Sequence, residues 1–332
     1  MKQTLFWLAL VGALLLAGCS AGESPEKGAK EWLQALSSLD GLKLDERTCS
    51  SQAAQLQQGG LMMLALGAFG KDLLGDSLKV NVDTENLVVT PLKTSGNSAL
   101  VQVKGTMRTG IGLVVAPQAV DAIWKMVKED GKWKYCGEAD ASVLREAGVF
   151  AKVAGRSFVA IDLPKLILQD NDVPSQNRSP WPTLEGPGII DYVFEGYSDR
   201  APECAPRTAE VVEIQTNTAV IRSAAVLFED FVQARQCFPT VSEAIQLQVL
   251  LHGNNDAQPL LANALGDQGA GFSATSNPRY WGLPKQSTAF LWRVGNVIFL
   301  LFCQSEAEQL SELSCAEAKI RPLAEKMQSR AK

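Results

Sequence analysis

The chain has 332 residues, of which 46% are hydrophobic and 20% are charged, and its formal net charge is −5. This composition is typical of a folded globular protein. A slightly acidic chain without a cluster of Lys and Arg lacks the electrostatic footprint of a nucleic-acid-binding protein and the polybasic patch of a peripheral membrane protein. We therefore expect no nucleic-acid partner.

The N-terminal residues have the pattern of an export signal. Lys2 precedes an apolar run at residues 5–16, which is shorter than the roughly 20 residues that a membrane-spanning helix needs. The stretch LLLAGCS (residues 14–20) contains Leu-Ala-Gly-Cys and resembles the lipobox of bacterial lipoproteins. The resemblance implies cleavage of the signal after residue 18 and lipidation of Cys19. Diacylglycerol would be attached to the Cys19 sulfur, and palmitate would be among the acyl chains. The alternative is an ordinary signal peptide that contains a cysteine by chance.

A multiply acylated Cys19 would anchor the protein stably, because each buried CH2 contributes about 0.8 kcal/mol and one chain alone binds marginally. The later apolar runs at residues 61–69 and 297–302 are too short to span a membrane. The sequence thus predicts an exported protein, lipid-anchored to the cell envelope on its periplasmic face or at the cell surface, with a tether at residues 19–23.

The remaining cysteines are even in number, which favours three disulfides in an exported protein. They are Cys49, Cys136, Cys204, Cys237, Cys303 and Cys315. A metal site would need a CxxC pair or nearby histidines, and the sequence has neither. No metal and no cofactor are expected.

The first predicted domain begins with helices and ends with strands. Ser24 can cap a helix with Pro25 at its first position, and apolar residues recur along one face up to Leu39. A buried helix is expected within residues 51–74. Alternating strands follow, with turns at residues 95–97 and 129–132.

This element order, with the strand SALVQVKGT (98–106) and the closing KEDGKWKYC (128–136), resembles the nuclear transport factor 2-like, or cystatin-like, half-barrel found in many bacterial lipoproteins. The resemblance covers residues 24–140. It implies an α+β domain, with Cys49 plausibly bridged to Cys136 on the last strand.

A connector at residues 141–156, with a short helix near 143–153, leads to a second α+β domain at residues 157–332. We expect strands at 189–197 and 209–215 and a helix at 220–237. A hairpin at 289–302 turns at Gly295-Asn296, where both residues tolerate positive φ. Ser314 and Glu317 form a capping box for the last helix.

The segments DLP (162–164), ALGDQGAGF (264–272) and WRVGNVIFLLF (292–302), with the amphipathic last helix, resemble the extracellular sensor domain of some actinobacterial Ser/Thr kinases and of stand-alone lipoproteins. Kinase signalling is not implied, because the sequence contains no kinase domain and no later spanning helix. The predicted layout favours the pairs Cys204–Cys237 and Cys303–Cys315, with the crossed pairing as the alternative.

Catalytic signatures are missing from the sequence. His252 is the only histidine, and a general base also needs an orienting partner and a nucleophile. There is no G-x-S-x-G elbow, and DNDVPS (170–175) lacks the glycine and glutamate of a calcium loop, so that a solvated turn is expected there. No catalytic residue is predicted.

Two groups of side chains are candidates for binding. A cone in the first domain could hold an apolar ligand, or its lining could simply fill the core; this lining comprises Trp32, Met62, Met63, Leu66, Phe69 and Trp124. A surface patch on Pro- and Gly-rich loops could contact a protein or a glycan, or could fold back over the sheet; it comprises Trp181, Arg279, Tyr280 and Trp281.

The sequence therefore predicts a disulfide-stabilised, non-catalytic envelope protein with two α+β domains, each an antiparallel sheet packed against helices. Its predicted role is to bind or sense an envelope protein, a glycan or a small apolar ligand at the cell surface. The alternative is a carrier that holds an apolar small molecule in the cone of the first domain.

Overall fold

The computed structural model describes most of the chain after the predicted tether. The described residues are 23–53, 80–111, 114–173, 177–180, 184–185, 204–253, 258–262, 265–276, 284–306 and 314–332. None of the helices within these ranges is long and apolar enough to cross a membrane. The expected strand at 189–197 and the helix expected within 51–74, apart from residues 51–53, lie outside the described residues.

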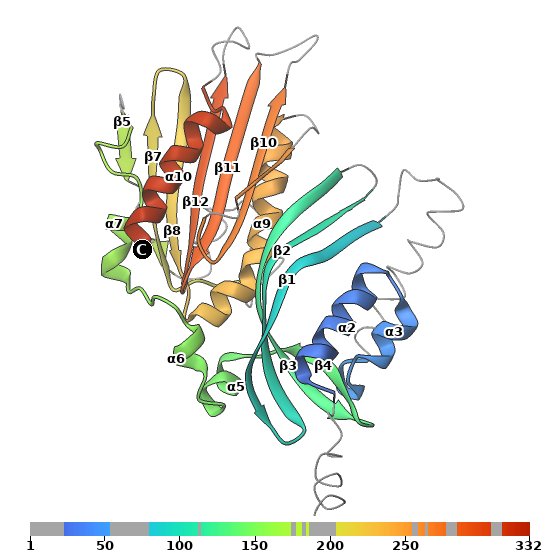
Figure 1. The fold of residues 1–332 in the computed structure, drawn as a ribbon. Helices are drawn as coiled ribbons and strands as arrows, with labels where there is room; N and C mark the ends of the chain where they lie inside the picture. Colours follow the sequence, from blue (N-terminus) through green and yellow to red (C-terminus); the bar gives the residue numbers. More distant parts are fainter. Residues whose placement is uncertain are drawn as a thin grey trace, which may run out of the picture. The chain divides into compact units, whose positions relative to one another are not determined.

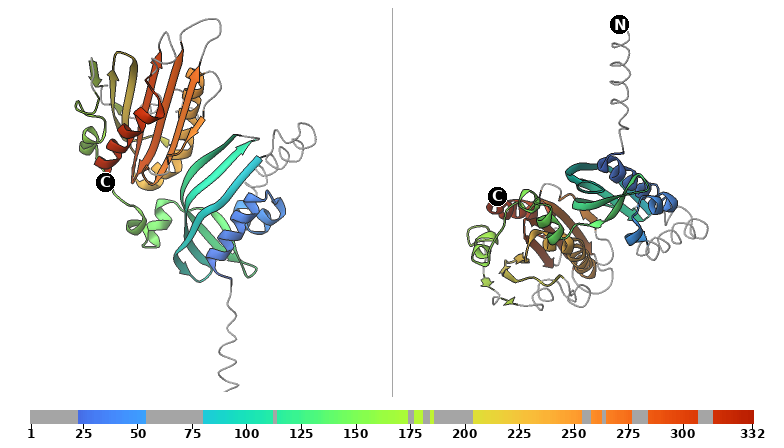
Figure 2. Two further views of the ribbon diagram at one scale, coloured as in Figure 1. Left: turned by 45° about the horizontal axis from the view of Figure 1, so that its top comes forward. Right: turned by 90° about the horizontal axis from the view of Figure 1, so that it is seen from below.

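The protein belongs to the α+β class, as predicted. It contains a four-stranded and an eight-stranded sheet, each packed against helices (Figures 1 and 2). Neighbouring strands whose register is given run antiparallel in both sheets. The chain divides into two compact units. The boundaries predicted at residues 140 and 157 stay predictions.

The four-stranded sheet is a meander in the order β1-β2-β3-β4. Its strands are β1 (Val80–Ser95), β2 (Ser98–Ile111), β3 (Val114–Glu129) and β4 (Lys132–Glu138). The two predicted turns are confirmed, because β1 and β2 are joined at residues 96–97 and β3 and β4 at 130–131. Strand β2 continues past the predicted strand at 98–106 and ends at Ile111. Membership of the nuclear transport factor 2-like family stays a prediction.

Helix α2 (Pro25–Ser37) begins where the sequence predicted. The Ser24 side chain accepts a hydrogen bond from the backbone N–H of Lys27, and Pro25 occupies the first turn. Trp32 and Leu33 are buried on the face that the apolar spacing indicated. Asp40 caps a second short helix, α3 (Gly41–Glu46). After it, Cys49 forms a disulfide with Cys136 of β4, the predicted pair, with a Cα–Cα distance of 5.2 Å.

The eight-stranded sheet has the order β5-β7-β8-β12-β11-β10-β9, and β6 pairs with β7. Its strands are β5 (Asn177–Pro180), β6 (Leu184–Glu185), β7 (Thr208–Gln215), β8 (Ala219–Leu227), β9 (Gln258–Leu260), β10 (Gln268–Ser276), β11 (Lys285–Val294) and β12 (Val297–Glu306). Strands β8, β12 and β11 lie at its centre, and most of their described residues are buried.

The hairpin of β11 and β12 is confirmed, with Val294 paired to Val297 across the turn. Gly295, the first central residue of the turn, has a φ of +57°, and Asn296 is not among the described residues with a positive φ, a combination that a primed turn of type II′ allows. The Asn296 side chain accepts a hydrogen bond from the N–H of Phe158 at 2.8 Å and donates to the carbonyl of Phe158 at 3.1 Å. This turn therefore holds the backbone at Phe158 in place.

The central sheet of the second unit is covered on both faces. Figure 1 shows α10 (Glu317–Ala331) in front of the strands and α9 (Phe231–Gly253) behind them. Alternate residues of β12 belong to different cores: Ile298, Leu300 and Phe302 lie in the core that contains α9 residues, and Phe299 and Leu301 in the core that contains α10 residues. This alternation follows from the two-residue period of a strand.

The predicted helix at 220–237 was wrong. Residues 219–227 form β8, and α9 begins at Phe231. The stretch is rich in Ala and apolar residues, and a short continuous apolar run does not distinguish a buried strand from a helix. Cys237 lies in the second turn of α9 and forms a disulfide with Cys204. The third disulfide, Cys303–Cys315, joins β12 to the segment before α10, so that all three favoured pairs are present.

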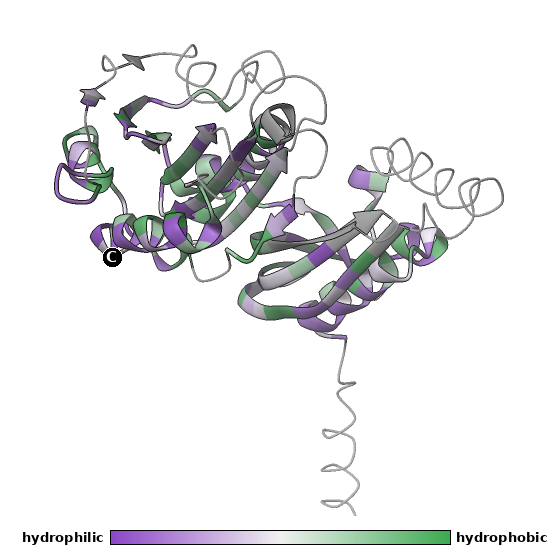
Figure 3. Cartoon of the chain, turned by 90° about the horizontal axis from the view of Figure 1, so that it is seen from above, coloured by the Kyte–Doolittle hydropathy of each residue, from purple (hydrophilic) through white to green (hydrophobic). Residues whose placement is uncertain are grey.

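Helix α10 is amphipathic (Figure 3), and its residues Ile320, Ala324 and Met327 are buried where the helix packs against the sheet. The predicted capping box was wrong, because the N-cap residue is Ala316 and no side chain caps the helix. Short helical segments link the two sheets along the chain. They are α5 (Ala141–Glu146), α6 (Phe150–Val153), η2 (Ala160–Asp162) and α7 (Leu163–Leu166).

Candidate ligand-binding groove

Two residues of the predicted cone, Trp32 and Trp124, are buried and in contact. Their ring centroids are 5.1 Å apart, and Tyr135 lies 4.5 Å from Trp32 and 4.9 Å from Trp124. The Trp32 indole donates to the hydroxyl of Thr48 at 3.1 Å. Burial, followed by the charge of Glu138, raises the pKa of Tyr135 to about 12. These three rings pack against one another, and they join α2 to strands β3 and β4.

The other candidate residues cannot be placed in the same way. Met62, Met63, Leu66 and Phe69 of the cone, all four residues of the surface patch and Cys19 lie outside the described residues. His252 lies in the last turn of α9. The described part of the chain contains no group of three or more His, Cys, Asp or Glu residues that could hold a metal.

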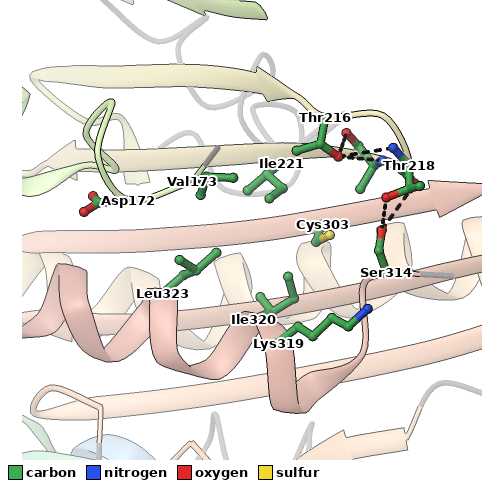
Figure 4. Close-up of a pocket in the computed structure, with 11 residues that line it drawn as sticks. Asp172, Val173, Thr216, Thr218, Ile221, Cys303, Ser314, Lys319, Ile320 and Leu323 are labelled. Carbon is green, nitrogen blue, oxygen red and sulfur yellow. Dashed lines mark hydrogen bonds between the residues drawn. The ribbon is translucent and has the colours of Figure 1, made fainter. Parts of the chain in front are cut away.

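A groove of about 300 Å³ in the second unit is the candidate site (Figure 4). It lies between the turn from β7 to β8, the face of β12 and the N-terminal half of α10. Its lining residues are Asp172, Val173, Thr216, Thr218, Ala219, Ile221, Cys303, Ser314, Lys319, Ile320 and Leu323. The volume is at the lower end of the range for small-molecule sites, about 300–1,000 Å³.

The middle of the groove is apolar. Figure 4 shows Val173 and Ile221 on one side and Ile320 and Leu323 on the other, with Cys303 between them. Cys303 and Cys315 are fully buried, and their disulfide fixes the start of α10 against β12. Because the disulfide ties two walls together, the width of the groove depends on a covalent bond rather than on packing alone.

One end of the groove is lined by hydroxyl groups. Thr218 donates its hydroxyl hydrogen to Ser314 at 2.9 Å, and Ser314 donates its own to the carbonyl of Thr218 at 3.3 Å. Thr216 is bonded to the backbone of Ala219, as acceptor from its N–H at 2.9 Å and donor to its carbonyl at 3.1 Å. These hydroxyls close the turn from β7 to β8 onto the segment before α10.

Asp172 lies at the other end (Figure 4). Its side chain is 2% exposed, and Arg330 donates to both of its oxygens at 2.6 Å. Lys326 is 2.9 Å away, and the backbone N–H of Gln169 donates at 2.6 Å. Burial alone would raise the pKa of Asp172, but the hydrogen bonds from Arg330, Gln169 and Lys326 outweigh it and lower the pKa below its ordinary value of 3.8.

Sequence reasoning identified residues 170–175 as a solvated turn and did not detect the ion-paired Asp172. It also treated Ser314 as a helix cap, whereas its side chain bonds to Thr218. The lining residues come from segments up to about 150 positions apart, from 172 to 323. No local spacing marks such a site; the only usable signal was the predicted Cys303–Cys315 pair, which brings two of the segments together.

The described lining of the groove is partly apolar and partly polar. It combines an apolar middle, hydroxyls already bonded within the protein, a carboxylate neutralised by two cations, and the exposed amine of Lys319. Acid–base or nucleophilic catalysis would need a base within hydrogen-bonding reach of a nucleophile. The described lining residues do not provide such a pair.

Comparison with known proteins leaves the family open. No protein-family model matches the chain. A 99-residue stretch is 35% identical to 3-methyl-2-oxobutanoate hydroxymethyltransferase of Pyrobaculum arsenaticum and covers 29% of this chain. The matched stretch spans only 37% of the length of that enzyme.

Two solved structures show a low similarity to this chain. The extracellular domain of PknH from Mycobacterium tuberculosis aligns with a TM-score of 0.31 and 10% identity, over 53% of this chain and 98% of that domain. An N-terminal dehydratase from the difficidin assembly line aligns with a TM-score of 0.18 and 10% identity, over 81% of this chain and 89% of the dehydratase. At these scores the fold assignment rests on the elements described above.

Proposed function

We propose that the protein is an exported, lipid-anchored and non-catalytic component of the cell envelope that binds a small ligand in the groove and acts as a binding or sensing protein. The groove is the observation that carries this proposal. It combines an apolar middle of suitable size with polar groups at both ends, which is the usual composition of a small-molecule site.

Export is supported by the disulfides. All six described cysteines are paired, and disulfides of this kind persist in oxidising compartments outside the cytoplasm. Each of the three bridges also joins segments that build a core or the groove. A protein kept in a reducing compartment would lose these links.

The lipid anchor is proposed at Cys19. Glu23, four residues later, accepts a hydrogen bond from Arg47 at 2.6 Å and another from the backbone N–H of Trp133 at 2.9 Å. The folded part of the chain therefore begins within a few residues of the proposed lipid. Metabolic labelling with a palmitate analogue tests this: label on the wild type and none on Cys19→Ala is expected, whereas equal labelling would contradict the anchor.

Ligand binding is tested by thermal-shift screening with small apolar and amphipathic compounds. Ala219 is partly exposed in the groove, so Ala219→Leu should narrow the site while the backbone bonds to Thr216 remain. Compounds that bind the groove should raise the melting temperature of the wild type and not that of this variant. Circular dichroism of both proteins without ligand provides the control for folding.

The alternative carrier function makes a different prediction. If compounds stabilise the wild type and Ala219→Leu equally, the ligand binds elsewhere, and the cone that Trp32 and Trp124 border becomes the first site to test. A protein or glycan partner at the aromatic loops would instead be lost with Trp181→Ala or Trp281→Ala and kept with Ala219→Leu.

A further inference from the structure

The chemistry of the groove depends on one face of α10. Lys319, Leu323, Lys326 and Arg330 are spaced by four, three and four positions, and residues with this spacing lie on one side of a helix. Lys319 and Leu323 line the groove, while Lys326 and Arg330 reach Asp172 at its end. This face of α10 therefore presents three cations and one apolar side chain to the site.

The charges at the groove do not balance. Asp172 is the only acidic side chain among the described lining residues, and it is paired with two cations, Arg330 and Lys326. No acidic side chain among the described residues pairs with Lys319. Glu317, in the same helical turn, is paired with Arg321. Counted over the described residues, the groove and its ion-pair partners therefore have more cations than anions, and Lys319 is the exposed cation of the lining.

Two further features favour an anion near Lys319. The first turn of α10 has no side-chain cap, so its backbone N–H groups add a partial positive charge beside Lys319. The hydroxyl hydrogens of Thr218 and Ser314 are donated within the protein. Among the described side chains at this end of the groove, the Lys319 amine is consequently the strong hydrogen-bond donor that a ligand could use.

We infer that the ligand is a small amphipathic monoanion, an alkyl carboxylate whose head group binds Lys319 and whose chain lies along Ile221, Ile320 and Leu323. The inference rests on the proposed function of the groove. Asp172, paired with Arg330 and Lys326, closes the far end, and the apolar middle offers no partner for a second charge on the ligand. The class of ligand is therefore an alkyl carboxylic acid rather than a neutral or cationic amphiphile.

The test compares three probes with the same alkyl chain: decanoate, decanol and decyltrimethylammonium. The protein is the mature chain with Cys19→Ser, exported through a general secretion signal so that no attached lipid competes. In calorimetric titrations below the critical micelle concentration, we expect decanoate to bind most tightly, decanol less tightly and decyltrimethylammonium most weakly. Lys319→Gln should weaken decanoate binding about fivefold, the upper end for an ion pair at an exposed lysine, and leave decanol unchanged.

Lys152→Gln, an exposed lysine of α6 outside the lining, is the matched control and should change no affinity. If decanol binds as well as decanoate and Lys319→Gln affects neither, the inference is wrong while the groove stands as a binding site. If decanoate binds Ala219→Leu and the wild type equally, or if no probe binds, both the inference and the proposed function of the groove are wrong.

Discussion

The Asp172 carboxylate is bound through both of its oxygens by Arg330, at 2.6 Å each, and this contact joins the segment after α7 to the last turn of α10. Lys326 and the backbone N–H of Gln169 also bind the Asp172 carboxylate. The groove residues Val173 and Leu323 lie near this contact on the same two segments. The shape of the groove therefore depends on an ion pair at one end and a disulfide near the other.

Removing the charge of Asp172 should destabilise the second unit. Asp172→Asn leaves Arg330 and Lys326 without a buried anion, and the expected loss is about 2 kcal/mol of unfolding free energy, within the range for hydrogen bonds to charged groups. Urea denaturation measures it. Asp45→Asn, at an exposed position of α3, is the control and should stay within about 0.5 kcal/mol of the wild type. Equal stability of the two variants would show that the pair is dispensable.

The contribution of Asp172 should also depend on pH. Its pKa in the folded protein is lowered, so the unfolded chain takes up the proton first as the pH falls. The stabilisation is fully present above the ordinary value of 3.8 and is lost as the pH falls through the folded pKa. The stability difference between wild type and Asp172→Asn should therefore shrink below about pH 4. A difference that grows on acidification would refute this assignment.

The three disulfides should differ in their effect on stability. Closing a loop of 12 residues, as Cys303–Cys315 does, stabilises by about 3 kcal/mol, and closing one of 87 residues, as Cys49–Cys136 does, by about 4.6 kcal/mol in the chain-entropy model. Paired replacements by serine, followed by calorimetry, measure these losses. The Cys303→Ser/Cys315→Ser protein should also lose ligand binding, whereas the Cys49→Ser/Cys136→Ser protein should keep it wherever it folds.

Two glycines with the same backbone angle should respond differently to alanine. Gly96 and Gly295 both have a φ of +57°, but a Cβ at Gly96 would meet nothing within 4 Å, whereas one at Gly295 would lie 1.6 Å from the carbonyl oxygen of Arg156. We expect about 1 kcal/mol of destabilisation at Gly96 from the backbone alone and about 3 kcal/mol or more at Gly295. Similar melting temperatures for Gly96→Ala and Gly295→Ala would contradict the close approach.

The aromatic cluster of the first unit, Trp32, Trp124 and Tyr135, should lose stability in proportion to how much of the Trp32 side chain is removed. Trp32→Phe keeps a ring between Trp124 and Tyr135 but loses the hydrogen bond to Thr48, at a cost of about 1 kcal/mol. Trp32→Ala empties the site and should cost about 3–5 kcal/mol. Leu42→Ala is the control, because Leu42 is 87% exposed. If the phenylalanine variant were as unstable as the alanine variant, the hydrogen bond would outweigh the packing.

The sequence predicted the elements with clear local signals. Ser24 and Pro25 mark the start of α2, Gly295-Asn296 marks the hairpin, and the three cysteine pairs are as favoured. The pair Cys204–Cys237 is present although the predicted layout that favoured it was partly wrong. Residues 219–227, which were predicted to belong to the helix at 220–237, form strand β8, and Cys237 lies in α9. An alanine-rich strand buried on both faces has neither the alternation of a half-exposed strand nor the charges of a surface helix.

The groove could not be predicted in the same way. Thr218, Ser314 and Lys319 are ordinary surface residue types, and their significance comes from a turn, a disulfide and a helix meeting in space. The Asp172–Arg330 contact joins positions 158 residues apart, and no pattern in the sequence connects them. Tertiary contacts of this range are invisible to periodicity and capping rules, which act over a few residues.

Native mass spectrometry of the mature chain, purified gently from an oxidising compartment and compared with a denatured sample, tests the central claim most directly. We expect a denatured mass six hydrogens below that of the fully reduced chain, since three disulfides form. We also expect additional mass from a small acid in the native wild type and none in native Ala219→Leu. A native mass equal to the denatured mass for both proteins after incubation with decanoate would contradict ligand binding in the groove.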